Sequence, residues 1–404
     1  MQYMLHGKVC LHQHYRLSQH TFLDKMVLLW GFERGGTKRL PIFCIGQHVN
    51  ASSKDIRSDL KLPFINNPAV SRKSIVVAST FLALVLRYIR AWLFHHHAAK
   101  IGDANIRWQL NIGSPSNGLE DARRDKAYRT LAATAWIQSQ CTNADQIAAC
   151  QTDVWHEGQA LCDLTDLQIR PEFVAQMAGY MQSPQKQKGL HALIDVGGGT
   201  LDIVTFIVHN VEGEDTFPFL VPQVHPLGTH GLIQNRLFGN TVVRNMVDEL
   251  QPIALPNEFS KTIGIDLQHI YARDELFSGE VRKVIQTVFD YTKNRRYRLS
   301  EAWLSGVRTF FTGGGASVNL YSQAVSSAKV PSAMGLLLRP LPPHPKLDGF
   351  TGHDEQYQRI SVACGLAQDS FTLGRVVPAK EVEDDLPVMP IQRERPNRDE
   401  LYPK

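Results

Sequence analysis

Residues 190–208, LHALIDVGGGTLDIVTFIV, constrain the fold more than any other stretch of this 404-residue chain. Two apolar runs of strand length, rich in Ile, Val and Thr, flank a glycine triplet, which predicts two strands of one hairpin. Glycine-rich turns also occur in ordinary hairpins that bind nothing. The acid before the glycines, and the threonine and second acid after them, favour the alternative that this turn binds phosphate.

The residues of the turn suit a phosphate site. Three positions without side chains allow backbone N–H groups to approach a ligand and form an anion-binding nest: Gly197, Gly198 and Gly199. Asp195 ends the first run, where it could hold Mg²⁺ through water, because this cation usually binds one or two carboxylates plus phosphate oxygens. Thr200 offers a hydroxyl to the same phosphate, and Asp202 is the second acid of the pattern.

Composition indicates an ordinary soluble protein, with 43% hydrophobic and 20% charged residues. A chain of this length can bury a full core and usually divides into two domains. The net charge of +4 is too small to indicate nucleic-acid binding, which we therefore do not expect. Six cysteines without a CxxC pair predict buried thiols in a reducing compartment, so we expect a cytoplasmic protein.

One stretch, residues 76–94, has the length of a membrane span. Arg87 and Arg90 lie inside it, and each arginine in the middle of a bilayer costs a few kcal/mol. We therefore expect a buried amphipathic helix over 74–94 and no membrane insertion. The first residues also lack the charged and apolar pattern of a signal peptide.

A second glycine triplet occurs in residues 310–316, FFTGGGA. It follows a predicted strand and precedes a predicted helix, and helix N-termini are suited to phosphate groups. The three glycines are Gly313, Gly314 and Gly315. We expect them to lie near the phosphate or ribose of a nucleotide.

The segment DVGGGTLD resembles the second phosphate motif of the actin-like ATPases, the superfamily of actin, the 70-kilodalton heat-shock chaperones, the sugar kinases and bacterial filament ATPases. TGGGA is similar to the adenosine motif of that superfamily and follows in its chain order. The resemblance covers roughly 39–369. It implies an α/β fold of two lobes, each with a central sheet flanked by helices, with ATP and Mg²⁺ in the cleft between them.

Pro171 and Glu172 open a predicted helix upstream of the hairpin. Proline is tolerated in a first helical turn and an acid there suits the helix dipole, so one alternative is a purely structural carboxylate. In the family that the chain resembles, a Pro-Glu pair at this place supplies a carboxylate that faces the nucleotide. The resemblance thus implies catalytic roles for Glu172 and Asp195.

The expected organisation has five parts. They are an unassigned, non-native or disordered start (1–30), an incomplete first lobe (31–189), a second lobe (190–350), a closing helix (351–375) and a disordered tail (376–404). Further expected elements are strands at 39–46 and 106–112, helices at 119–138 and 355–369, and a proline-rich loop at 332–345.

The resemblance also implies a first phosphate loop, an acid-x-Gly-Thr turn upstream of residues 39–46. Gly35-Gly36-Thr37 follows Arg34 and not an aspartate at a predicted strand end, so we expect residues 1–38 to supply no such turn. Two alternatives follow: a truncated start, which we favour, or a natural pseudo-ATPase. Either way, we expect weak nucleotide binding and poor hydrolysis from the chain as it stands.

The favoured function is an ATP-binding, slowly hydrolysing switch protein nearest the nucleotide-binding domain of the heat-shock chaperones, without a substrate-binding domain. The alternative is a non-catalytic or filament-forming interaction protein with the actin fold. A small-molecule kinase is less favoured, because no substrate-binding loop with a base is identified. Expected partners are ATP and ADP, a protein, and further copies of the chain.

Overall fold

The computed structural model describes strands at 26–32, 39–45 and 56–57, and residues 60–383 with gaps. The gaps are 62, 65–66, 68, 103–105, 107, 116–120, 141–166, 212, 239–252, 254, 346, 348–349, 351–353 and 369–373. Most of the expected start (1–30) and residues 384–404 of the expected tail lie outside the described residues.

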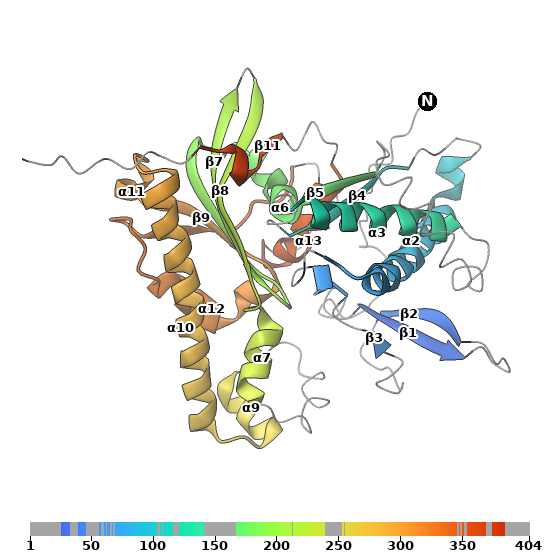
Figure 1. The fold of residues 1–404 in the computed structure, drawn as a ribbon, viewed down its shortest axis with the longest axis horizontal. Coiled ribbons are helices and arrows are strands. Elements are labelled where there is room, and N and C mark those ends of the chain that lie inside the picture. The colour runs from blue at the N-terminus through green and yellow to red at the C-terminus, as the bar shows by residue number, and fades with distance from the viewer. Residues whose placement is uncertain are drawn as a thin grey trace, which may run out of the picture.

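A six-stranded sheet with the order β10-β9-β6-β7-β8-β11 is the largest sheet in the described part of the chain (Figure 1). Its strands are β6 (Gly189–Val196), β7 (Leu201–Val211), β8 (Glu214–His225), β9 (Val307–Thr312), β10 (Leu336–Arg339) and β11 (Arg375–Val377). β6 and β7 are antiparallel with Val196 opposite Leu201, which confirms the predicted hairpin. On its other side β6 pairs with β9 in parallel.

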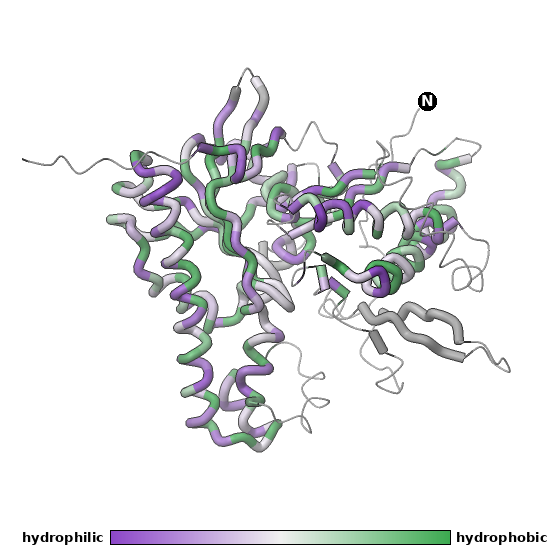
Figure 2. The backbone as a smooth tube through the Cα atoms, in the orientation of Figure 1, coloured by the Kyte–Doolittle hydropathy of each residue, from purple (hydrophilic) through white to green (hydrophobic). Residues whose placement is uncertain are grey.

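Helices pack on both faces of this sheet through two separate clusters of buried residues. One face is covered by α7 (Thr229–Leu237), α10 (Leu267–Tyr291) and α12 (Asn319–Ser327), and the other by α6 (Glu172–Met181) and α13 (Asp354–Leu366). This arrangement confirms the predicted α/β class with a central sheet flanked by helices. Figure 2 shows hydrophobic and hydrophilic residues alternating along α10, as expected for a helix with one face on a sheet.

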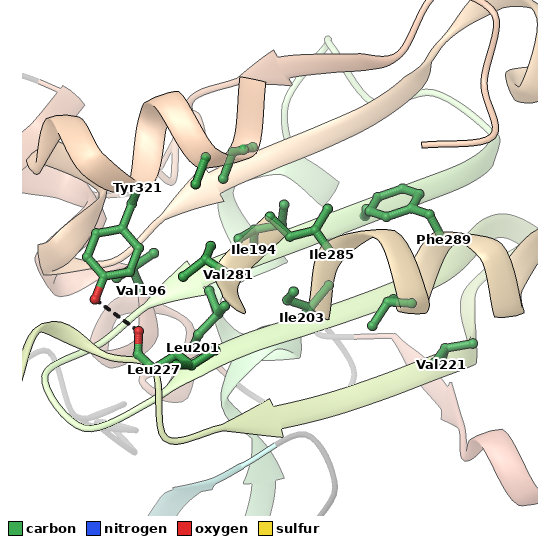
Figure 3. Packing of buried hydrophobic residues seen from close by; sticks show 14 of the residues in the cluster. Ile194, Val196, Leu201, Ile203, Val221, Leu227, Val281, Ile285, Phe289 and Tyr321 are labelled. Atoms are coloured by element: carbon green, nitrogen blue, oxygen red, sulfur yellow. Dashed lines mark hydrogen bonds between the residues drawn. The ribbon is translucent and has the colours of Figure 1, made fainter. Parts of the chain in front are cut away.

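The first cluster fills the space between strands β6 and β7 and helices α10 and α12 (Figure 3). Ile194 and Ile203 of the strands are fully buried, as are Val281 and Ile285 of α10. Tyr321 of α12 is also buried, and its hydroxyl donates a hydrogen bond to the carbonyl of Leu227 over 2.9 Å. This bond ties α12 to the segment that leads from β8 into α7.

The second cluster explains why α6 differs from the prediction. Phe173, Met177 and Tyr180 were expected to mark one apolar face, but every residue from 173 to 181 is buried. The helix lies between the sheet and α13, so that a side chain at Gly365 of α13 would overlap a backbone carbonyl of α6. α6 therefore shares its core with β6, across the lobe boundary expected at 189.

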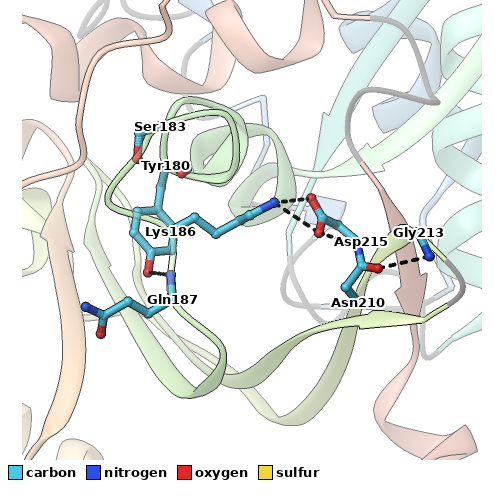
Figure 4. Close-up of polar contacts among 7 residues, drawn as sticks. All are labelled: Tyr180, Ser183, Lys186, Gln187, Asn210, Gly213 and Asp215. Atoms are coloured by element: carbon cyan, nitrogen blue, oxygen red, sulfur yellow. Dashed lines mark hydrogen bonds and ion pairs between the residues drawn. The ribbon is translucent and has the colours of Figure 1, made fainter.

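Polar contacts join the turn after α6 to the outer end of the β7–β8 hairpin (Figure 4). Lys186 Nζ lies 2.8 Å from Asp215 Oδ2, and Asn210 Nδ2 donates to the same carboxylate over 3.1 Å. The Asn210 side chain in turn accepts the amide of Gly213 over 2.9 Å. These bonds hold the long hairpin against the element that precedes it.

The strands before β6 form two separate sheets. One has the order β2-β1-β3, from β1 (Met26–Phe32), β2 (Arg39–Ile45) and β3 (Ile56–Arg57); the other pairs β4 (Leu110–Ser114) with β5 (Leu167–Pro171) in parallel. β4 and β5 share a core with α2 (Arg72–Ile101) and α3 (Ala122–Gln140). The strand expected at 39–46 and the helices expected at 119–138 and 355–369 are confirmed, with shifted ends, and the strand expected at 106–112 begins at Leu110.

The helix expected at 74–94 is longer than predicted and is buried less than expected. Its buried residues lie in its first half, whereas Tyr88 and Phe94 are 41% and 49% exposed. Within the described residues α2 is the one helix long and apolar enough to cross a membrane, and 28% of its most apolar window is buried. Length and composition alone are weak evidence for a span, because core helices pass the same test.

Two expectations for the C-terminal part are corrected. The loop expected at 332–345 contains β10, which pairs with β9 in parallel. The tail expected to be disordered from 376 begins with β11, which pairs with β8, and continues into the short helix η4 (Ala379–Glu381). Both strands have four residues or fewer, too few for a period in the sequence to show, and each is defined by its pairing partner. The remaining elements are α9 (Pro256–Ile263), η2 (Thr292–Arg296), α11 (Ala302–Ser305) and η3 (Gly314–Ser317).

Candidate functional site

The two glycine triplets lie side by side because β6 and β9 are parallel neighbours that end at the same edge of the sheet. Asp195 is opposite Thr312 in this register. Gly313 has φ of 90°, and a Cβ atom there would overlap Oδ1 of Asp195. Only glycine fits at this position, so that the second turn packs directly on the carboxylate at the end of β6.

The backbone of the first turn is oriented by the N-terminus of α7. The amides of Thr229 and His230 donate to the carbonyls of Gly197 and Gly198 over 3.0 and 2.7 Å. A side chain on Gly228 would overlap the backbone nitrogen of Thr200, which explains the glycine before this helix. With the carbonyls held by α7, the amide of Gly198 has no backbone acceptor within the described residues. It is available to an anion, as is required of a nest.

Open space lies above both turns. A Cβ atom added at Gly198 or at Gly314 would meet no heavy atom within 4 Å, and both residues are exposed. Gly315, by contrast, contacts Val196 so closely that a Cβ atom would overlap the valine side chain. Each triplet thus has a glycine that faces solvent, and the two exposed positions belong to neighbouring turns.

Two carboxyl groups lie under the turns in a poorly solvated environment. Asp195 Oδ2 accepts a hydrogen bond from Gln176 Nε2 of α6 over 2.7 Å. Burial raises the pKa of Asp195 to about 6 despite this bond. Burial likewise raises the pKa of Asp202, which is 7% exposed, to about 7, and outweighs the opposing charge of Lys61. Both groups would ionise more readily beside a cation.

Glu172 makes an ion pair that the sequence did not predict. Its two carboxylate oxygens lie 2.8 and 2.6 Å from Lys61 Nζ. The side chains of Lys61 and Glu172 are 43% and 19% exposed, so the pair opens to solvent. Gly113, at the end of β4, leaves room for Glu172, since a Cβ atom there would lie 2.8 Å from its Cγ. Lys61 is close enough to influence Asp195 and Asp202 as well.

Several buried polar atoms around these carboxyl groups have no hydrogen-bond partner in the described residues. They are Asp202 Oδ1, Thr312 Oγ1, Gln176 Oε1, Ser114 Oγ and Tyr128 Oη. Unpaired buried polar groups are costly, and such a concentration is typical of a site that binds water, an ion or a ligand. Among the described residues, no three His, Cys, Asp or Glu side chains are close enough to hold a metal ion by themselves. A cation here would need water or phosphate oxygens to complete its ligand shell.

The predicted site residues therefore meet in one region. The structure brings together Glu172, Asp195, Gly197, Gly198, Gly199, Thr200, Asp202, Gly313, Gly314 and Gly315 at the edge where β6 and β9 end. Two further residues were missed. Gln176 lies four residues after Glu172 in one helix, a spacing that could have indicated it. Lys61 belongs to no pattern in the sequence, and its position is visible only in the structure.

The raised pKa of Asp202 predicts how stability changes with pH in the absence of nucleotide and metal. Its pKa is 3.8 in the unfolded chain and about 7 in the folded state. The native state thus binds more protons between these values, so this group lowers the free energy of unfolding as pH rises through the window. Relative to the wild type, Asp202→Asn should gain about 2 kcal/mol of stability between pH 5 and pH 8.

Urea unfolding of both proteins at the two pH values measures this difference. His191, whose burial lowers its pKa to about 4, and Asp195, whose pKa is raised to about 6, are present in both proteins, so their own titrations cancel in the comparison to first order. The exposed Asp290→Asn serves as control and should show no such trend. A constant difference between Asp202→Asn and the wild type at both pH values would contradict the prediction.

No protein-family model and no curated protein matches the chain. Among solved structures it is similar to an archaeal actin homologue in complex with ADP (15% identity, 85% of this chain and 88% of that chain, TM-score 0.39) and to the apo psk41 ParM protein (13%, 90% and 87%, 0.34). It is also similar to a PilM–PilN type IV pilus biogenesis complex (15% identity, 55% of this chain, TM-score 0.32) and spans 58% of the length of that chain. These TM-scores are below 0.5, so the functional proposal is drawn from the geometry of the site.

Proposed function

We propose that the chain is a nucleotide-binding protein with an actin-like fold, which binds ATP with Mg²⁺ at the edge where β6 and β9 end and hydrolyses it slowly. One observation carries this proposal. The first glycine turn begins two residues after Asp195, the second packs on the carboxylate of Asp195 at Gly313, and Gly198 and Gly314 face open space. Two adjoining backbone surfaces without side chains suit the two halves of a nucleotide, one for phosphate and one for adenosine.

Each turn has its own part in this proposal. The amide of Gly198 binds the phosphates, and the turn at 313–315 lies along the adenosine. Thr200 is buried and its side chain hydrogen-bonds to Asp202, so it supports that carboxyl group instead of meeting the phosphates as the sequence predicted. Lys61 lies near the buried carboxyl groups and brings a positive charge to the phosphate side of the site. Phosphoryl transfer depends mainly on positioning and charge neutralisation, which these groups supply.

The residues present fit a magnesium ion that is held mainly by water and phosphate. Asp195 would bind the ion through water. Asp202 is close enough for the charge of Asp195 to raise its pKa, and its Oδ1 has no hydrogen-bond partner in the described residues. When bound, the ion would neutralise negative charge on the phosphates. Gln176, by donating to Asp195, keeps that carboxyl group directed towards the turns.

Glu172 is the proposed group that orients the attacking water. Its carboxylate is partly exposed and lies in the same electrostatic environment as Asp195 and Asp202. The ion pair with Lys61 favours a second candidate function, a nucleotide-binding protein without turnover, because a carboxylate held by a lysine is less available to water. The two candidates differ in hydrolysis but not in binding.

Coupling of nucleotide binding to a protein partner completes the proposal. We place the protein in the cytoplasm, as a switch that closes two lobes on a nucleotide in the way of the heat-shock chaperones. The alternative is a protein that associates with further copies of itself into filaments. Sedimentation with and without nucleotide distinguishes these alternatives.

Isothermal titration calorimetry of the full chain with Mg-ATP tests the proposed function. We expect saturable binding that weakens when EDTA removes the metal, and a thermal unfolding midpoint that rises with ATP concentration by mass action. Titration with GTP measures the preference for the base. Absence of both binding heat and thermal stabilisation with either nucleotide would overturn the proposal.

A further inference from the structure

The three most exposed large hydrophobic side chains in the described part of the chain lie at one corner of the molecule. Leu299 is 91% exposed, Leu304 is 76% exposed and Met334 is 67% exposed. Scattered exposed leucines are ordinary, but a group of apolar side chains at one place marks an interaction surface. We call residues 291–305, together with 329–334, the basic corner.

Hydrogen bonds hold the two segments of the basic corner together. The amide of Ala333 donates to the carbonyl of Trp303 over 2.8 Å, and Ser332 Oγ donates to the carbonyl of Ala302 over 3.1 Å. Trp303 is itself 4% exposed and anchors the corner in the core below. Leu304 comes directly after Trp303, and Met334 directly after Ala333. Because Trp303 and Ala333 are joined by this hydrogen bond, the backbones that carry the two exposed side chains are neighbours. In Figure 1 this corner surrounds α11, at the end of α10.

Positive charge surrounds these apolar side chains. Residues 290–305 contain two acids and four basic residues, Lys293, Arg295, Arg296 and Arg298, and Lys329 adds a fifth from the neighbouring segment. The guanidinium of Arg296 donates to the carbonyls of Leu220 and Ala379, so the charges that remain at the corner are those of the other four. Lys293 Nζ donates to the carbonyl of Pro331 over 2.9 Å, which places its charge between the two segments. The start of this basic run is the π-helix η2, an uncommon conformation that is frequent at functional sites.

We propose that the basic corner docks on an anionic lipid bilayer. Its apolar side chains project from a loop and from the single-turn helix α11, where they can enter the headgroup region, while lysine and arginine reach the lipid phosphates. Tyr291, 49% exposed, is of the residue type enriched at membrane interfaces. Tyrosine and arginine also occur in protein-binding hot spots, but leucine, the most exposed residue type of the corner, is under-represented there, so a protein partner is the less favoured occupant.

The corner is distinct from the nucleotide site. The basic corner leads into Val307, the first residue of β9, whereas Thr312 and Gly313 of the site lie at the other end of that strand. Docking at the corner would leave the glycine turns accessible. Lipid binding therefore does not depend on the proposed nucleotide binding, and either can fail without the other.

Co-sedimentation of the full chain with lipid vesicles tests this proposal. We expect binding to vesicles that contain phosphatidylglycerol, little binding to pure phosphatidylcholine, and release at high salt, because exposed charges are then screened. Leu299→Ser with Leu304→Ser should lower the partition coefficient about tenfold or more, since two apolar side chains no longer enter the bilayer. Arg295→Glu with Arg298→Glu should lower it by at least a similar factor.

Control variants alter exposed residues of the same types elsewhere in the chain. Leu276→Ser on α10 and Lys261→Glu on α9 should bind vesicles as the wild type does, and all variants should keep the thermal unfolding midpoint of the wild type. No vesicle binding by the wild type at low salt, or equal loss in control and corner variants, would overturn the proposal. Binding of a poly-glutamate peptide that depends on the corner residues, without vesicle binding, would also overturn it and assign the corner to an acidic protein partner.

Discussion

Replacing Gly198 with valine is expected to lower the affinity for Mg-ATP about 100-fold or more, a loss of roughly 3 kcal/mol, while the fold remains intact. A side chain here meets open space in the protein, and Gly198 is not among the described glycines with positive φ. Valine therefore costs the protein little strain. It would, however, stand where phosphate has to approach the amide of the turn. Calorimetry with Mg-ATP measures the loss.

The control for this experiment is Gly279→Val in α10. A Cβ atom there has its nearest neighbour, Arg282 Nη2, at an ordinary 3.7 Å, and the position is remote from the glycine turns in the sequence. This variant should keep the affinity of the wild type, and both variants should unfold cooperatively. Unchanged ATP binding by Gly198→Val would show that the first turn is not the phosphate site, even if the protein binds ATP elsewhere.

Replacing Glu172 with glutamine should lower the rate of ATP hydrolysis about 100-fold and leave ATP binding in place. Glutamine has nearly the same shape as glutamate but cannot orient water as a base. It also removes the negative charge that pairs with Lys61 Nζ at 2.6 Å, so the lysine becomes free to meet phosphate. Binding should therefore be equal or tighter, whereas single-turnover hydrolysis should be slow.

A matched control separates catalysis from helix stability. Glu258 is an exposed acid in the first turn of α9, as Glu172 is in the first turn of α6. Glu258→Gln tests what a first-turn carboxylate contributes through the helix dipole, about 0.3–1 kcal/mol. If Glu172→Gln loses binding and rate equally, its role is structural. If neither the wild type nor the variant hydrolyses ATP while both bind it, the chain is the non-catalytic alternative.

Much of the fold could be predicted because local patterns carry it. The hairpin of β6 and β7 shows in two β-branched runs around a glycine triplet, and α6 shows in the Pro171-Glu172 start. The α/β class follows from such alternating elements. Short elements could not be predicted, because β10 and β11 have too few residues for a period and form only where a neighbouring strand offers hydrogen bonds.

The candidate site divides in the same way. The types of its residues were readable in the sequence, since three glycines flanked by acids suggest a phosphate turn wherever they occur. The parallel register that places Thr312 beside Asp195 was not readable, because it joins residues more than a hundred positions apart. The requirement for glycine at position 313 was also not readable in the sequence, because it arises from contact with the distant carboxylate of Asp195.

Charge and solvation were decided by tertiary structure alone. Burial raises the pKa of Asp202 to about 7, and no local pattern states how much water a carboxyl group retains after folding. The ion-pair partner of Glu172 is Lys61, which lies 111 residues earlier in the chain and was not among the site residues predicted from the sequence. The sequence by itself determined which groups are available and in which local conformations. Tertiary packing decided which of them meet and which lose their water, because contact and desolvation depend on segments distant in the chain.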